Sequence, residues 1–108
     1  MKLAPEQIND VAARAALAAS GPAKVMVFGS YARGDAAEDS DLDLLVIEPA
    51  FADKAQEYLR IRKAIGLLGI GVDLLLYAES EFERRSTVKG TLPYRAKREG
   101  KVIYERAA

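Results

Sequence analysis

Three aspartates, Asp41, Asp43 and Asp73, are the residues of this chain best suited to chemistry. Asp41 and Asp43 are two positions apart, so on a strand both carboxylates would project from one face, about 6.6 Å apart along the chain. Such a pair can share divalent cations, which lie ~3.5–4 Å apart in two-metal sites. Taken alone, however, an Asp-x-Asp pair is commonly a solvated strand entrance.

Asp73 adds weight to the metal-binding interpretation because it is the one charge in an otherwise apolar segment, 71–77. A carboxylate inside a strand needs a cation, hydrogen bonds or an opening to water, since burying it unpaired is costly. If this strand lies beside the strand predicted at 41–47, the three carboxylates form a cluster. Such oxygen ligands suit magnesium or manganese, completed by substrate phosphates and water.

Gly29 and Ser30 directly follow an apolar segment that reads as a buried strand. The backbone must turn sharply there to begin a short helix, whose unpaired N–H groups and positive dipole end could hold a phosphate. A Gly-Ser pair alone is more often a simple helix cap. Arg33 falls on the same short helix and could contact the phosphate. Its alternative is a surface ion pair with Asp35 or Glu38.

Together, Gly29-Ser30, the ten residues that follow, Asp41-x-Asp43 and the later Asp73 resemble the signature of the DNA polymerase beta nucleotidyltransferase superfamily. The wording Gly-Ser-Tyr-Ala-Arg-Gly and the short chain resemble its minimal nucleotidyltransferases (MNT), similar to the MntA-type antitoxins of HEPN/MNT toxin–antitoxin pairs. The likeness runs from about residue 23 to 104. It implies that Asp41, Asp43 and Asp73 are catalytic and hold two Mg²⁺ (or Mn²⁺) ions. It also implies that Gly29, Ser30 and Arg33 bind the nucleotide, ATP.

The same resemblance implies an activity, namely metal-dependent transfer of AMP from ATP to a hydroxyl with release of pyrophosphate. The expected acceptor is a tyrosine of a partner HEPN toxin, which gives the chain an antitoxin role. Two alternatives stay open. Transfer to a small molecule such as an aminoglycoside is disfavoured by the lack of room for a second domain. A non-catalytic binding module is disfavoured because all three acids are present. A homodimer is a further way to cover the active face.

Length and composition limit the chain to one expected domain, 1–108, without a separate substrate-binding domain. Its 16 basic and 16 acidic residues cancel, which argues against strong attraction to nucleic acid or an anionic membrane. The absence of cysteine and histidine excludes disulfides, thiolate or imidazole metal ligands and a histidine base. No signal-peptide pattern or long apolar segment is present, so a cytoplasmic protein is expected.

Periodicity predicts an α+β fold, with a small mixed sheet of three to four strands, helices packed on one side and the acids on the open side. The expected strands are 23–28, 41–47, 71–77 and 101–104, and the expected longer helices are 5–19, 52–68, a helix from 80 to about 89, and 91–99. Ser80 and Glu83 have the form of a capping box. The third of the chain after residue 80 is basic, and this surface is either a solvated face or one that steers ATP or docks an acidic partner. Its cations are Arg84, Arg85, Lys89, Arg95, Lys97, Arg98, Lys101 and Arg106.

Overall fold

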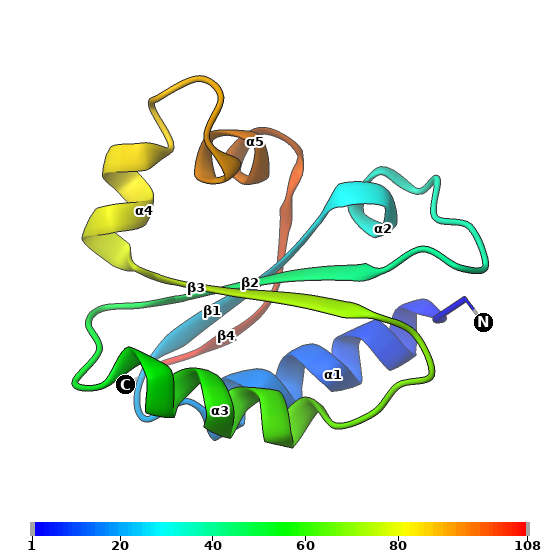
Figure 1. Cartoon of the computed structure of the whole chain (residues 1–108), viewed down its shortest axis with the longest axis horizontal. Coiled ribbons are helices and arrows are strands. Elements are labelled where there is room, and N and C mark those ends of the chain that lie inside the picture. The colour runs from blue at the N-terminus through cyan, green and yellow to red at the C-terminus, as the bar shows by residue number, and fades with distance from the viewer. Residues whose placement is uncertain (1, 108) are drawn as a thin grey trace.

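The computed structural model describes residues 2–107, which form a four-stranded mixed sheet in the order β3-β2-β1-β4 (Figure 1). Both β2 and β4 run antiparallel to β1, whereas β2 and β3 are parallel. The strands are β1 (Ala23–Phe28), β2 (Leu42–Glu48), β3 (Val72–Ala78) and β4 (Lys101–Arg106). The predicted α+β fold with a mixed sheet is therefore confirmed.

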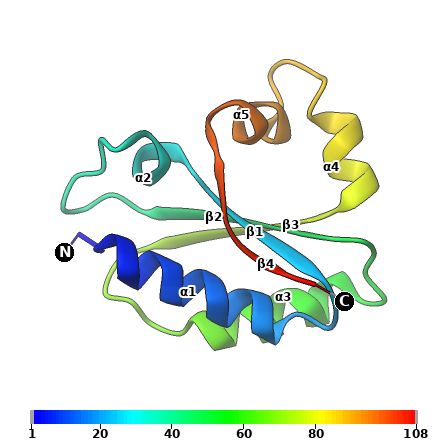
Figure 2. The same cartoon turned by 180° about the vertical axis from the view of Figure 1, so that it is seen from behind.

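Two helices, α1 (Pro5–Ala18) and α3 (Lys54–Ile65), lie side by side on one face of this sheet (Figures 1 and 2). The shorter α4 (Glu79–Arg85) and α5 (Leu92–Glu99) stand on the other face, and the single-turn α2 (Gly29–Arg33) follows β1 directly. The predicted helices on one side correspond to α1 and α3. Among residues 2–107, no helix is long and apolar enough to cross a membrane.

Two apolar clusters explain why both faces of the sheet are covered. The first packs alternate strand residues such as Val25, Leu42 and Leu44 against α1 and α3. The second packs the residues of opposite orientation, including Phe28 and Leu45, against α4 and α5. Because β2 is apolar on both faces except at Asp43 and Glu48, leaving either face open would expose a large apolar surface. The acids thus lie on a face that is only partly covered.

Specific residues set the ends of two short helices. Gly34 closes α2 in the left-handed conformation, at φ 85°, and the Thr91 side chain caps α5 by accepting a hydrogen bond from the Tyr94 amide. The capping box at Ser80 was wrong. The cap residue of α4 is Ala78, without a side-chain hydrogen bond, because β3 runs straight into the helix and Ser80 already lies in its first turn.

The apolar residues that recur at helical spacing in and around the predicted helix 52–68 do not all form its buried stripe; they are Phe51, Ala55, Tyr58, Ile61, Ile65 and Leu68. Ala55 and Tyr58 are exposed, whereas the charged Glu57 is only 4% exposed. The helix is also shorter than predicted, and Glu57 takes the core-facing position one turn before Ile61. A charged residue gives no apolar signal, so the pattern misplaced the first turn of the stripe.

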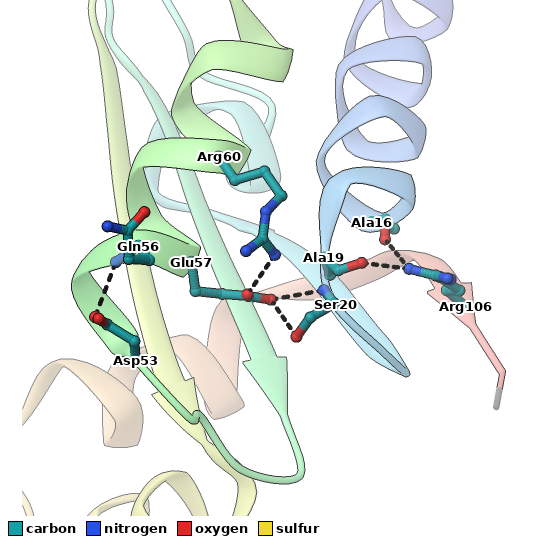
Figure 3. A network of polar contacts seen from close by, with 8 residues as sticks. All are labelled: Ala16, Ala19, Ser20, Asp53, Gln56, Glu57, Arg60 and Arg106. Carbon is teal, nitrogen blue, oxygen red and sulfur yellow. Dashed lines mark hydrogen bonds and ion pairs between the residues drawn. The ribbon is translucent and has the colours of Figure 1, made fainter.

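The buried Glu57 joins the start of α3 to the segment that follows α1 (Figure 3). Its carboxylate accepts hydrogen bonds from the Ser20 amide at 2.8 Å, the Ser20 hydroxyl at 3.2 Å and Arg60 at 2.8 Å. Glu48 of β2, 2% exposed, hydrogen-bonds Glu57, and its Oε2 atom has no hydrogen-bond partner in the described chain. Burial, followed by the bond to Glu57 and the charge of Glu57, raises the pKa of Glu48 to about 8. Glu48 is therefore protonated at neutral pH and ties β2 to α3.

Candidate active site

Asp43 of β2 and Asp73 of β3 are register partners on adjacent parallel strands. Partners in a parallel pair project to the same side, so both carboxylates lie on the face that carries α4 and α5, while Leu42 and Leu44 point to the α1 side. The two carboxyl groups are close enough to hydrogen-bond each other. The structure therefore brings together the strand pair that the sequence predicted, at the end of the sheet where β2 and β3 begin.

The pKa of Asp43 is raised to about 6, and the causes describe its surroundings. Partial burial is the largest, followed by the hydrogen bond to Asp73 and the negative charges of Asp73 and Asp41. Arg95 acts in the opposite direction. Asp43 is thus a half-buried carboxyl group surrounded by like charges, a condition that a bound cation would relieve.

The residues present fit a divalent cation in part. Asp43 and Asp73 supply hard oxygen donors side by side, the kind that magnesium and manganese take together with phosphate oxygens and water. Asp41 is exposed and acts on Asp43 through its charge. However, no group of three potential ligands within residues 2–107 is already gathered so that it could hold a metal ion. The three-carboxylate metal centre therefore stays a prediction.

Two glycines bring backbone against these acids. Gly29 has φ 70°, and a Cβ atom there would lie 2.2 Å from Asp43 Oδ2. At Gly71 a Cβ atom would lie 2.4 Å from Asp41 Oδ1. Gly29 therefore serves two purposes at once, since it allows the sharp turn from β1 into α2 and leaves room for the Asp43 carboxylate. The turn was predicted from the sequence, whereas the contact with Asp43 was not.

Ser30 and Arg33 lie on α2, next to this contact. Ser30 is half-buried, and its carbonyl accepts hydrogen bonds from the amides of Gly34 and Asp35. Arg33 pairs with Asp35 at 3.3 Å, as its surface alternative predicted, and with Glu99 of α5 at 3.3 Å. The second ion pair links α2 to α5 across the face that holds the acids. Nucleotide binding by Gly29, Ser30 and Arg33 stays a prediction.

Arg95 of α5 is the residue near the acids that sequence reasoning missed. It is exposed, and its positive charge lowers the pKa of Asp43 against the other influences. In the sequence it is one of eight cations of the last third, none of which stands out. The available signal was the helix itself, because the Thr91 cap and the apolar pair Leu92 and Ala96 fix which side of α5 faces the sheet.

A cavity of about 660 Å³ opens elsewhere on the same face. Its apolar floor includes Met26, Ile47 and Phe82, and its walls come from α4, α5 and β4. The lining includes Ala23 and Lys24 at the start of β1 and Ile47 near the end of β2, away from the acids, and none of the predicted site residues lines the cavity. The cavity is thus separate from the carboxylate pair.

Comparison with known proteins decides the family. The model of the nucleotidyltransferase domain matches residues 10–99, which is most of the chain. The chain belongs to the nucleotidyltransferase domain family. Asp43 and Asp73, together with the Gly29 turn, lie inside the matched region of this nucleotidyltransferase.

Two named relatives are similar over parts of their length. One is "Putative protein adenylyltransferase MJ0604" of Methanocaldococcus jannaschii, 33% identical over 81 residues that cover 75% of this chain and 77% of the relative. The other is "Protein adenylyltransferase MntA" of Thermococcus cleftensis, 41% identical over 61 residues, 52% of this chain and 57% of the relative. The crystal structure of a "putative nucleotidyltransferase" from Sulfolobus solfataricus has the same fold, with a TM-score of 0.59, 20% identity, and coverage of 94% of this chain and 79% of that one.

Proposed function

We propose that this nucleotidyltransferase moves AMP from ATP to a hydroxyl of a partner protein, with magnesium or manganese as the cofactor. The observation that carries the proposal is the Asp43–Asp73 pair. The half-buried carboxylate of Asp43 and the exposed carboxylate of Asp73 are in register on adjacent strands, beside the start of α2. The family match supports the reaction class, and two relatives named as protein adenylyltransferases support a protein acceptor.

In this proposal each of the predicted site residues has a separate role. The backbone at Gly29 and Ser30 would receive the phosphates, and Arg33, further along α2, is the third residue of the proposed nucleotide site. Asp43 and Asp73, joined by Asp41, would hold up to two divalent cations together with phosphate oxygens. When bound, these cations would offset the negative charge that develops on the attacking and leaving oxygens.

The transfer itself would form one bond and break another. The acceptor oxygen bonds to the α-phosphorus of ATP, the bond from that phosphorus to the bridging oxygen breaks, and pyrophosphate leaves with its electron pair. The acceptor proton goes to the exposed carboxylate of Asp73, so no histidine is required. Asp43 lies against the backbone of Gly29 and is the register partner of Asp73.

The acceptor we propose is a tyrosine hydroxyl on a HEPN-type toxin, which the modification would inactivate. Support for this partner comes from the resemblance to MNT antitoxins and from the open position of the acids. Asp41 and Asp73 are both exposed, so a large partner can approach them without the chain having to open. A second copy of the chain could cover the same face in the absence of that partner.

The direct test incubates the protein with labelled ATP, magnesium and the product of the adjacent reading frame. An AMP-sized mass gain on the partner, mapped to a tyrosine, is the expected result. Asp43→Asn should abolish labelling, whereas Asp39→Asn, an exposed acid of the preceding loop, should leave it unchanged.

Other outcomes separate the remaining alternatives. Labelling of an aminoglycoside instead of the partner would favour a small-molecule transferase. Neutralisation of the toxin by Asp43→Asn as fully as by the wild type, without labelling, would show a binding module and refute the proposed reaction.

A further inference from the structure

The orientation of α5 places one arginine over the acid end of the sheet. Leu92 and Ala96, one turn apart, pack into the second apolar cluster and so define the sheet-facing side of the helix. Arg95 and Glu99 are also one turn apart, so they share the neighbouring side. Glu99 pairs with Arg33 of α2, which shows that this side of α5 faces α2. Arg95 therefore lies on the α2-facing side as well, and α2 begins at Gly29, whose backbone lies against Asp43.

The two arginines of this region differ in what they contact. The guanidinium of Arg33 is engaged by two carboxylates, Asp35 and Glu99. The side chain of Arg95 is exposed and makes no hydrogen bond or ion pair with residues 2–107. Binding a phosphate through Arg33 requires that an existing ion pair be broken or shared, whereas Arg95 can bind without such a loss.

We propose that Arg95 binds the triphosphate of ATP at the carboxylate pair, an inference that rests on the proposed function. The need for such a residue follows from charge, since a polyphosphate must approach three aspartates. A cation beside them reduces that repulsion, and a guanidinium can donate two parallel hydrogen bonds to phosphate oxygens. Arg95 is also one of the charges that act on Asp43, and it opposes the upward shift of the pKa of that carboxyl group.

The test measures binding of ATP with magnesium to the full chain by calorimetry, without any acceptor. Arg95→Gln should weaken ATP binding about tenfold or more, the effect of losing one strong charged contact. Adenosine binding should be unchanged, because it has no phosphate. The ATP affinity of Arg95→Lys should lie between those of the wild type and Arg95→Gln, since lysine keeps the charge but loses the paired hydrogen bonds.

Lys97→Gln is the matched control, because Lys97 is an exposed cation of the same helix that lines the cavity away from the acids. It should bind ATP as the wild type does. Equal ATP affinity in Arg95→Gln and the wild type, or equal losses in Arg95→Gln and Lys97→Gln, would overturn the inference while leaving the proposed function in place. A wild-type chain that binds no ATP at all would overturn both.

Discussion

At the scale of single residues, the fold holds two like-charged carboxylates close together, and this conflict defines the site. Asp43 is partly withdrawn from water and placed against Asp73, so one of the two carboxylates resists ionisation in the absence of a cation. Sites built this way store an unfavourable interaction that a ligand of opposite charge can release. The metal-free protein is therefore less stable than its apolar packing alone would allow.

This conflict gives the first prediction. In metal-free buffer near neutral pH, the free energy of unfolding of Asp43→Asn should exceed that of the wild type by on the order of 1 kcal/mol after solvent screening. Asp43→Asn should therefore unfold at a higher temperature. Magnesium or manganese should raise the melting temperature of the wild type and leave that of Asp43→Asn unchanged. Thermal melts with and without the cation measure both effects, and equal stabilisation of the two proteins would speak against cation binding at Asp43.

The sign of the pH dependence follows from the raised pKa. Between the ordinary value, 3.8, and about 6, the folded chain holds a proton on Asp43 that the unfolded chain has lost. The contribution of Asp43 to stability is therefore complete below this window and is lost as pH rises through it. Asp43→Asn should flatten the stability curve in the same window.

Gly29 gives a second prediction of a different kind. Gly29→Ala should cost at least about 1 kcal/mol of stability, since the new residue must adopt φ 70° and its Cβ meets the Asp43 carboxylate. It should also displace Asp43 and so abolish the stabilising effect of magnesium. Gly21→Ala, where a Cβ meets nothing within 4 Å, should change stability by less than about 0.5 kcal/mol. Denaturant titrations of the two variants provide the comparison.

The residue types of the site could be predicted from the sequence, but their contacts could not. Asp43 and Asp73 can be recognised in the sequence as charges within apolar segments, and period-two alternation predicts that they project from one face of the sheet. Arg95 carries no such signal, since a cation on an exposed helix side looks like any other. Glu48 and Glu57 were missed for the opposite reason, because a carboxylate in the core contradicts the pattern that locates a core.

At the scale of elements, α5 decides what lies above the acids. Its start is fixed by Thr91, whose hydroxyl accepts from the Tyr94 amide at 3.2 Å and lies 2.8 Å from the carbonyls of Arg85 and Val88. The same side chain thus caps α5 and closes the turn that follows α4. The existence and start of α5 were predictable from Thr91 and Pro93, while its position across the sheet depends on long-range packing.

The third prediction concerns this cap. Thr91→Ala should cost about 1 kcal/mol of stability, the usual loss for a helix N-cap, and should weaken ATP binding because Arg95 lies on the first turns of α5. Thr91→Ser keeps the hydroxyl and should behave almost as the wild type does. Melting curves and ATP titrations of both variants check the two effects. An unstable Thr91→Ala protein with undiminished ATP affinity would separate the cap from the site.

At the scale of the whole molecule, the buried Glu48–Glu57 pair couples stability to alkaline pH. The groups that face Glu48 are Glu57 and Arg60 of α3 and Arg106 of β4. Burial alone would raise the pKa of Glu57, but the hydrogen bonds from Glu48 and Ser20 and the charge of Arg60 lower it. Glu57 is therefore ionised at neutral pH, and Glu48 is the member of this pair that titrates on the alkaline side.

The fourth prediction follows from that assignment. From 4.5 to about 8 the folded state keeps a proton on Glu48 that the unfolded state has lost, so stability falls as pH rises through this range. Glu48→Gln keeps a hydrogen-bond donor for Glu57 and removes the charge. It should be more stable than the wild type at about pH 9, by roughly 1–3 kcal/mol. Urea unfolding from about pH 6.5 to about pH 9.5 tests this, with the exposed Glu83→Gln as a control that should follow the wild-type curve.

The parallel pairing of β2 with β3 also sets when the site comes into existence. The chain must complete the α3 crossover before Asp73 can reach Asp43, which lies against the Gly29 turn. A partly synthesised or partly unfolded chain that lacks the third strand carries the Asp-x-Asp pair without its opposing acid. Such a fragment lacks the Asp43–Asp73 pair on which the proposed transfer of AMP depends, so the proposed activity would begin only once β3 has paired with β2.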